Sequence, residues 1–290
     1  MATVDVYEGL PFTEMVVNSS STVQANALLR LGVFVPVKRN YKANELAASS
    51  AHVIDASEEF RTLKFVEKEG YRNVTVTGLR LNFDTDFKVW CGIIQAFYES
   101  GYQSEVSVKF TDFAKLCGFP TKRIDKALRA RLDDSFLRLR NQAIQFRESS
   151  HDKGKSYTGG LISSIAYDTE EDIVTLVPDP KLWELYKIDH QVLLQLKALS
   201  KLPRQEVAQC LYVYLSALPE RPYPISFTRL RERMQLTSSK VAEQNRSISS
   251  AINKLISIGY LQGSVVKKGS DRYLLVEKRC PKLSLRGLPK

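Results

Sequence analysis

The residues with the most specific chemistry lie along one polar stripe of the stretch 240–258. Apolar residues such as Ile248 and Ile252 recur there every three or four positions, which predicts a helix with one buried face. At 100° per residue, the opposite face carries Arg246 and Asn253. Arginine can chelate O6 and N7 of guanine, and asparagine N6 and N7 of adenine, each pair giving about 1–3 kcal/mol of base discrimination. The stripe therefore predicts base reading in a DNA major groove. For each residue the alternative is an ordinary hydrated helix face.

Small polar and basic residues around this stripe extend the predicted surface. Short side chains let a helix approach base edges closely, and Lys240 stands at the turn, where phosphate contacts usually set the register. Ser238 or Ser239 can cap the helix. Two alternating stretches around KKGSD (267–271) then predict a hairpin with a basic tip. The predicted DNA contacts of this region are Lys240, Gln244, Asn245, Arg246, Ser249, Ser250, Asn253, Lys254, Lys267, Lys268 and Arg272.

A second, more basic helix is predicted over 122–140. Its apolar residues, among them Leu128 and Leu132, fall on one side, and lysines and arginines fall on the other. A run of charges on a helix usually indicates only a solvated face. This helix, however, occupies the same position as 240–258 in an internal repeat, so phosphate binding is an equal alternative. The predicted phosphate contacts are Lys122, Arg123, Lys126 and Arg129.

The repeat consists of two stretches 117 residues apart, VKFTDFAKLCGF (108–119) and ISFTRLRERMQL (225–236). Each begins like a strand and continues with Phe-Thr. Apolar residues then follow at the same offsets, which are Phe113, Cys117 and Phe119 in the first copy and Leu230, Met234 and Leu236 in the second. Short apolar patterns also recur by chance, so the surrounding elements decide whether the repeat is structural.

The elements predicted around both copies follow one order: helix, short strand, helix, turn, long helix and strands. This is the order of a winged helix, whose helix-turn-helix places its second helix in a major groove. The chain of 290 residues also suits two domains better than one. We therefore predict an α+β fold of two tandem winged-helix domains related by pseudo-symmetry and joined by a helical connector.

Four segments follow from this reading. Residues 1–72 are predicted to form an N-terminal segment with a flexible linker and short helices, including helices over 23–36 and 55–69. Residues 73–180 are the first winged-helix domain, 181–202 a connector helix, and 203–290 the second winged-helix domain and principal DNA reader.

The charge of the chain lies in its last third. The net charge is +10, and residues 203–290 hold 16 basic and 6 acidic residues, whereas residues 1–202 hold 26 of each. One-sided positive charge favours a polyanion as the partner. On charge alone, a basic surface that serves solubility is an equal alternative.

Other classes of protein find little support. No apolar run approaches the roughly 18 residues of a membrane span, and MATVDVYEGL lacks the features of an export signal. The four cysteines are far apart in the sequence, which predicts reduced thiols in a cytoplasmic protein, three of them packed in cores. KGKSYTGG (153–160) lacks the first glycine of a phosphate-binding loop, and no metal-binding or catalytic spacing of histidines occurs. We predict a non-enzymatic protein without cofactor or metal.

Seven stretches spread over residues 23–286 carry a resemblance to a known family. They are LLRLGVFVP, TDFKVWCGIIQAF, FAKLCGFPTKRIDK, KLWELYKIDHQVLLQLKAL, FTRLRERMQL, EQNRSISSAINKLISIGYL and KRCPKLSL. In order and spacing the chain resembles the RepA-type replication initiators of iteron plasmids and plasmid prophages. Ser249 and Ser250 stand where that family leads us to expect longer basic side chains, which points to a different iteron sequence.

The resemblance implies a cytoplasmic bacterial protein associated with its plasmid. Such an initiator binds directly repeated double-stranded sites, called iterons, at the origin and opens the origin with host DnaA. It also recruits the replicative helicase, represses its own promoter and thereby takes part in copy-number control. The resemblance further implies an inactive homodimer, formed through roughly residues 74–180, which the chaperones DnaJ, DnaK, GrpE or ClpA convert into an active monomer.

Two rival functions remain at this point. A sequence-specific transcriptional repressor would bind DNA in the same way without opening an origin. A nicking initiator enzyme would cut supercoiled origin DNA in the presence of Mg²⁺. Two reading helices on one face of B-DNA lie about 10–10.5 bp apart, so one monomer is expected to cover roughly 20 bp.

Overall fold

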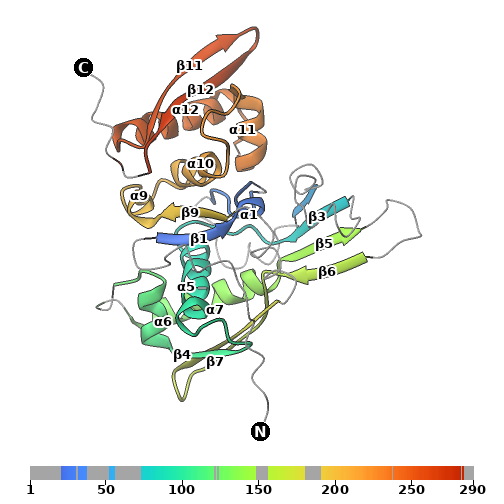
Figure 1. Ribbon diagram of the computed structural model, residues 1–290, viewed down its shortest axis with the longest axis vertical. Coiled ribbons are helices and arrows are strands. Elements are labelled where there is room, and N and C mark those ends of the chain that lie inside the picture. Colours follow the sequence, from blue (N-terminus) through green and yellow to red (C-terminus); the bar gives the residue numbers. More distant parts are fainter. Residues whose placement is uncertain are drawn as a thin grey trace.

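The computed structural model describes residues 21–30, 32–37, 52–55, 73–120, 122, 124–147, 156–179, 191–236, 238–281 and 283. These residues form two units of helices and small sheets, and the C-terminal unit is at the top of Figure 1. A short segment from the start of the described chain lies between the two units.

The C-terminal unit is a winged helix. Its elements are α10 (Glu206–Ser216), β10 (Ile225–Ser226), α11 (Phe227–Met234), α12 (Val241–Ser257), β11 (Leu261–Lys268) and β12 (Asp271–Arg279). The strands pair antiparallel in the order β10-β12-β11, and β11 and β12 form the long hairpin at the top of Figure 1. Helix α11 is followed by Gln235, whose left-handed backbone (φ 46°) turns the chain toward α12.

The N-terminal unit repeats this order. Its elements are α5 (Asp86–Glu99), β4 (Val106–Lys109), α6 (Phe110–Leu116), α7 (Lys126–Arg140), β7 (Ile162–Asp168) and β8 (Ile173–Pro178). The strand order β4-β8-β7 matches that of the C-terminal unit position by position. An inserted hairpin of β5 (Ala143–Arg147) and β6 (Ser156–Gly160) joins β3 (Asn73–Gly78) and β2 (His52–Asp55) in a separate sheet, ordered β2-β3-β5-β6.

The repeated sequence stretches occupy equivalent places in these two units. Each forms a strand followed by the first helix of a helix-turn-helix, and its apolar residues point into a core. Phe110, Phe113, Cys117 and Phe119 are buried in the first copy, as are Phe227, Leu230 and Met234 in the second, while Leu236 is partly buried. The predicted α+β fold of two tandem winged helices is therefore confirmed.

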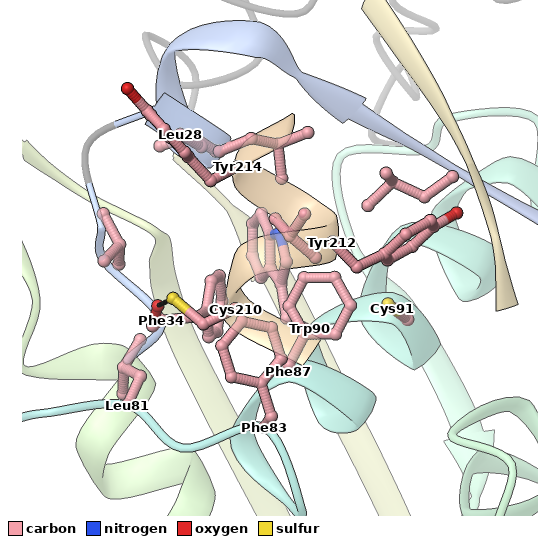
Figure 2. Close-up of a cluster of buried hydrophobic side chains, with 14 of the residues drawn as sticks. Leu28, Phe34, Leu81, Phe83, Phe87, Trp90, Cys91, Cys210, Tyr212 and Tyr214 are labelled. Carbon is pink, nitrogen blue, oxygen red and sulfur yellow. Dashed lines mark hydrogen bonds between the residues drawn. The ribbon is translucent and has the colours of Figure 1, made fainter. Parts of the chain in front are cut away.

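One apolar core runs through both units (Figure 2). In the segment between the units, Leu28 lies beside Tyr214 of α10, whereas Phe34 lies near Leu81 and Phe87 of the N-terminal unit. Phe34 packs edge-on against Phe87 with the ring centroids 4.9 Å apart, and its carbonyl oxygen accepts a hydrogen bond from Cys210 Sγ. The units are thus packed together, and the predicted boundaries at residues 73, 181 and 203 stay a prediction.

The connector predicted as one helix over 181–202 is wrong in its described part. Residues 180–190 lie outside the described residues, and Gln191–Gln195 form strand β9, followed by the short helix α9 (Leu196–Ser200). Strand β9 pairs antiparallel with β1 (Ser21–Ala25). Pairing between segments distant in sequence supplies the backbone hydrogen bonds that a helix would otherwise form locally, and no local pattern predicts it.

Two helix predictions near the N-terminal unit need correction, and a third lies outside the described residues. Among the described residues of the stretch 23–36 only α1 (Asn26–Arg30) is helical, and residues 23–25 belong to β1. The helix predicted over 122–140 begins at Lys126, after Asp125 caps it by accepting a hydrogen bond from the Leu128 amide (2.8 Å). The helix predicted over 55–69 and the linker before it lie outside the described residues, except that residue 55 ends β2.

All four cysteines are free, and three of them, Cys91, Cys117 and Cys210, are buried, as predicted. Burial raises the pKa of the Cys91 thiol to about 12, so this thiol stays protonated and unreactive.

Candidate nucleic-acid interface

Helix α12 exposes the predicted polar stripe. Its apolar face is buried in the C-terminal unit through Ile248, Ala251, Ile252 and Leu255, which fixes the rotation of the helix about its axis. Arg246, Ser250, Asn253 and Ser257 are exposed on the opposite face and line a groove. Arg246 and Asn253 form no hydrogen bond or ion pair with another described residue, so both side chains can bind a ligand.

Gln244 and Asn245 have structural partners instead. Gln244 donates from Nε2 to the carbonyl oxygens of Leu236 (3.0 Å) and Ser238 (2.6 Å) and so ties α12 to the preceding turn. Asn245 accepts a hydrogen bond from Arg231 Nη1 (2.6 Å), which connects α12 to α11. Their side chains stabilise the helix-turn-helix, and each would have to exchange a partner before it could contact a base.

The start of α12 is exposed, with Lys240 before the helix and Glu243 in its first turn, but it is not capped as predicted. Lys240 is the residue before the helix and makes no side-chain cap, so the cap predicted at Ser238 or Ser239 is wrong. The Ser238 hydroxyl donates to Glu243 instead (2.6 Å). Lys240 Nζ lies 4.0 Å from Glu243, and its side chain is 76% exposed. It can therefore turn toward a phosphate.

The hairpin of β11 and β12 places three predicted contacts at its tip. Lys267, Lys268 and Arg272 are exposed, and Lys267 pairs with Arg272 across the two strands. Asp271 orients the tip, because its carboxylate accepts hydrogen bonds from the Thr228 amide of α11 (3.3 Å) and from the Arg272 amide (2.8 Å). Ser249 and Lys254 are partly exposed at the two borders of the α12 stripe.

The predicted contacts of the N-terminal unit divide into two kinds. Lys126 is exposed at the start of α7, and Lys122 is exposed in the turn before it. Arg129 has internal partners, since it forms a bidentate ion pair with Asp172 (Nη2 to Oδ2, 3.1 Å), donates to the Tyr167 hydroxyl (2.7 Å) and stacks over Phe110. It links α7 to the β7–β8 hairpin. Arg123 lies outside the described residues.

The comparisons with known proteins point to one family. The family model described as "Initiator Replication protein, WH1" matches residues 50–216. The chain is 47% identical over 272 residues to a "Protein RepA" of Escherichia coli, an alignment that covers 93% of this chain and 92% of that one. The chain belongs to the family of RepA-type plasmid replication initiators.

Further comparisons agree with this assignment. A "Replication protein RepA" of Salmonella typhi is 41% identical over 270 residues, with 93% of the initiator and 76% of that relative covered. Among solved structures, domains 2 and 3 of RctB superpose with a TM-score of 0.54 at 12% identity, covering 92% of this chain and 99% of that one. At this level of identity the superposition supports the winged-helix fold alone.

One residue of the groove in this initiator was missed by the sequence reasoning. Arg204 is exposed, has a left-handed backbone (φ 61°) and lies two residues before α10, where it lines the same groove as Arg246 and Asn253. Its position just before the helical apolar spacing of residues 206–216 was a usable signal, because helix N-termini often approach phosphates. Glu206 also lines the groove and accepts a hydrogen bond from the Val37 amide (2.6 Å).

Within the described part of the initiator, no group of histidine, cysteine and carboxylate side chains could hold a metal ion. Nor does any described helix have the length and apolar character needed to cross a membrane.

Proposed function

We propose that this initiator binds directly repeated DNA sites at a plasmid origin, with α12 as the principal reader of bases. The observation that carries the proposal is the exposed stripe of Arg246, Ser250 and Asn253, in which the two long side chains have no described partner. Lys240, Lys267, Lys268, Arg272 and Arg204 surround the stripe and would contact phosphates on either side of the groove. Family membership supports the same reading.

Both winged helices would contact one duplex. The N-terminal unit repeats the fold of the C-terminal unit, and Lys122 and Lys126 are exposed at the start of its equivalent helix. We expect α12 to select the sequence and α7 to add phosphate contacts about one helical turn away, so that a monomer covers roughly 20 bp.

The finer activities are proposed from the family resemblance. We propose that the initiator opens the origin together with host DnaA, recruits the replicative helicase and represses its own promoter. We further propose that the monomer is the form that binds iterons, and that DnaJ, DnaK, GrpE or ClpA produce it from a homodimer.

For the homodimer we propose a surface on the N-terminal unit. Strands β2 and β6 are the described edges of the four-stranded sheet, and an edge strand offers unpaired backbone groups to a second chain. A charge at an edge opposes such pairing. Thr158→Lys on β6 should therefore weaken dimerisation in sedimentation experiments and leave the iteron affinity of the monomer unchanged.

A footprint of the full chain on the origin of its own plasmid tests the main proposal. Hydroxyl-radical cleavage should show protected segments on one face of each repeat, covering roughly 20 bp, with no discrete protection on a random duplex of equal length. Protection that follows no repeat would contradict it.

Two further assays on the same DNA separate the rival functions. With DnaA present, permanganate should detect unpaired thymines in A·T-rich origin DNA. Protection without such opening would support a transcriptional repressor. A nicked product on supercoiled origin DNA with Mg²⁺ would support an enzyme.

A further inference from the structure

The N-terminal unit holds the turn that leads into α12. Arg80, two residues beyond β3, donates from Nη2 to the main-chain carbonyl oxygen of Gln235 (2.7 Å) and to Gln235 Oε1 (3.3 Å). Gln235 is the left-handed residue at the end of α11. Arg80 therefore contacts the helix-turn-helix at its main chain, where a displacement would move both of its helices.

The hydrogen bonds continue from this turn into the reading helix. The carbonyl oxygen of Leu236, the residue after Gln235, accepts a hydrogen bond from Gln244 Nε2 of α12 (3.0 Å). Gln244 donates to Ser238 as well (2.6 Å), so the turn and the first turns of α12 are tied together. The position of Arg80 is thereby transmitted to the helix that carries Arg246.

Gly32, in the segment between the units, packs closely against α11 near the same turn. A Cβ atom at Gly32 would lie 2.5 Å from the carbonyl oxygen of Arg233 in α11, and Gly32 has a φ of +66°. The close approach and the backbone conformation both require glycine at this position.

Neighbouring contacts anchor this segment to both units. Val35 donates its amide to the Leu81 carbonyl oxygen (2.8 Å), directly beside Arg80, and Phe34 bridges to Leu81. On the other side, Arg30 Nε donates to the Ala217 carbonyl oxygen at the end of α10 (2.9 Å). The segment thus holds the two units in one relative position.

We infer that Arg80 is a positioning residue that sets the distance and rotation between α7 and α12, and so determines which spacing of the two half-sites the initiator accepts. One additional base pair moves a half-site by about 3.4 Å and rotates it by about 35°. Two rigidly joined readers can follow this change only by deforming the DNA or breaking a contact. The inference rests on the proposed function, in which both units contact one duplex.

The test uses the full chain and three duplexes. The first is the origin repeat defined by the footprint, and the other two carry one base pair inserted or deleted between the segments protected by the two units. Affinity is measured by fluorescence anisotropy for wild type, for Arg80→Gln and for the charge-matched control Arg221→Gln. Arg221 is an exposed arginine of the loop between α10 and β10.

We expect wild type and Arg221→Gln to lose about 10-fold in affinity on each altered spacing, and Arg80→Gln to lose less than about 3-fold. A general loss of stability would weaken binding to all three duplexes by the same factor. It would therefore leave the ratio of the affinities for the native and the altered spacing unchanged. Gly32→Ala, which forces α11 away from the segment, should lower the ratio in the same direction.

The affinities for the three duplexes distinguish a failure of the proposed function from a failure of the inference about Arg80. A wild-type chain that does not distinguish the repeat from random DNA refutes the proposed function. A wild-type chain that is specific but binds all three spacings equally refutes the inference alone, as does an Arg80→Gln chain with the wild-type ratio. If Arg80→Gln does not fold, Arg80→Lys replaces it. Its shorter reach should give an intermediate ratio, and the wild-type ratio would again overturn the inference.

Discussion

Helices α12 and α7 take the same place in two copies of one fold, but they expose different chemistry. When the buried Leu128 and Leu132 of α7 are matched to Ile248 and Ile252 of α12, the stripes correspond residue by residue. Arg246, Ser250, Asn253 and Ser257 stand opposite Lys126, Ala130, Asp133 and Leu137. The α7 stripe thus holds a carboxylate and an apolar side chain that is 60% exposed. The C-terminal stripe suits base reading along its length, whereas the N-terminal one suits phosphate binding only at its first turn.

The two helices also differ in how they are anchored. Helix α7 is tied to α5 by a buried ion pair, in which Arg138 Nη2 lies 2.7 Å from Asp86 Oδ1. Ser135 and Asn82 donate further hydrogen bonds to the same carboxylate (2.7 and 2.8 Å). In α12 the buried face is apolar. The two units thus share the frame of the winged helix but differ in the surface and the anchoring of this helix.

Removing the buried charge should have the largest effect. Asp86→Ala leaves Arg138 buried without its partner and should lower the free energy of unfolding by about 3–5 kcal/mol in urea titrations. Asp112→Ala is the matched control, because Asp112 forms an exposed pair with Lys115 on α6 (2.7 Å) and should cost less than about 1 kcal/mol. Equal losses for both variants would show that the network does not anchor α7.

The next largest effect concerns sequence preference. Arg246→Ala and Asn253→Ala should each reduce the ratio of specific to random binding by about 5- to 150-fold, the equivalent of about 1–3 kcal/mol per base contact. Asn253→Asp, which introduces the residue type of α7, should reduce it at least as much, since a carboxylate cannot donate to adenine N7. Anisotropy with both duplexes at one salt concentration measures the ratio. An unchanged ratio would mean that Arg246 and Asn253 do not read bases, and α12 would then not differ from α7 in this respect.

Phosphate contacts should give smaller and uniform effects in both units. Lys267→Ala, Lys268→Ala and Lys126→Ala should weaken specific and random binding alike, and each should reduce the salt slope by about 0.9. Salt titrations of both duplexes measure this slope. If Lys126→Ala changes the specific-to-random ratio, α7 reads bases too and the two helices are more alike than their surfaces indicate.

The smallest effect is a pH dependence within the N-terminal unit. The hydrogen bond from Arg129 holds the pKa of Asp172 below its usual value. A depressed folded-state pKa stabilises the protein at pH values above the unfolded pKa of about 3.9, and this stability is lost as the pH falls through the folded value. Because the pair is partly exposed, Asp172→Asn should cost less than about 1 kcal/mol near pH 6.

The difference between wild type and Asp172→Asn should be smaller at pH 3 than at pH 6, because the stabilisation is progressively lost as the pH falls below the unfolded pKa and through the lowered pKa of Asp172. Urea unfolding at both pH values measures it. A difference that persists at the lower pH would mean that the Asp172 side chain contributes through packing and not through its charge.

Periodicity and the repeat were sufficient to predict both winged helices. The buried spacing of Ile248 and Ile252 determined which side of α12 faces outward, and for this reason the exposure of Arg246 and Asn253 was predicted correctly. These features are local, because the spacing of apolar residues along a helix decides its rotation in the core.

What the sequence could not show has a different cause. Gln244, Asn245 and Arg129 stay predicted DNA contacts, but in the folded chain they bind Leu236, Arg231 and Asp172, which come from other elements. The β1–β9 pairing likewise joins segments about 170 residues apart. A single sequence shows which side chains can donate a hydrogen bond, but the folded neighbours decide which of them are already satisfied.

The central claim is that α12 chooses the bases and α7 does not. The most direct test selects DNA sites from a randomised duplex library with three full-length chains: wild type, the double variant Arg246→Ala with Asn253→Ala, and the double variant Lys126→Ala with Asp133→Ala. We expect the α12 variant to lose or alter base preferences in the selected sites, and the α7 variant to select the wild-type sequence. An α7 variant that changes the selected bases while the α12 variant keeps them would contradict the claim.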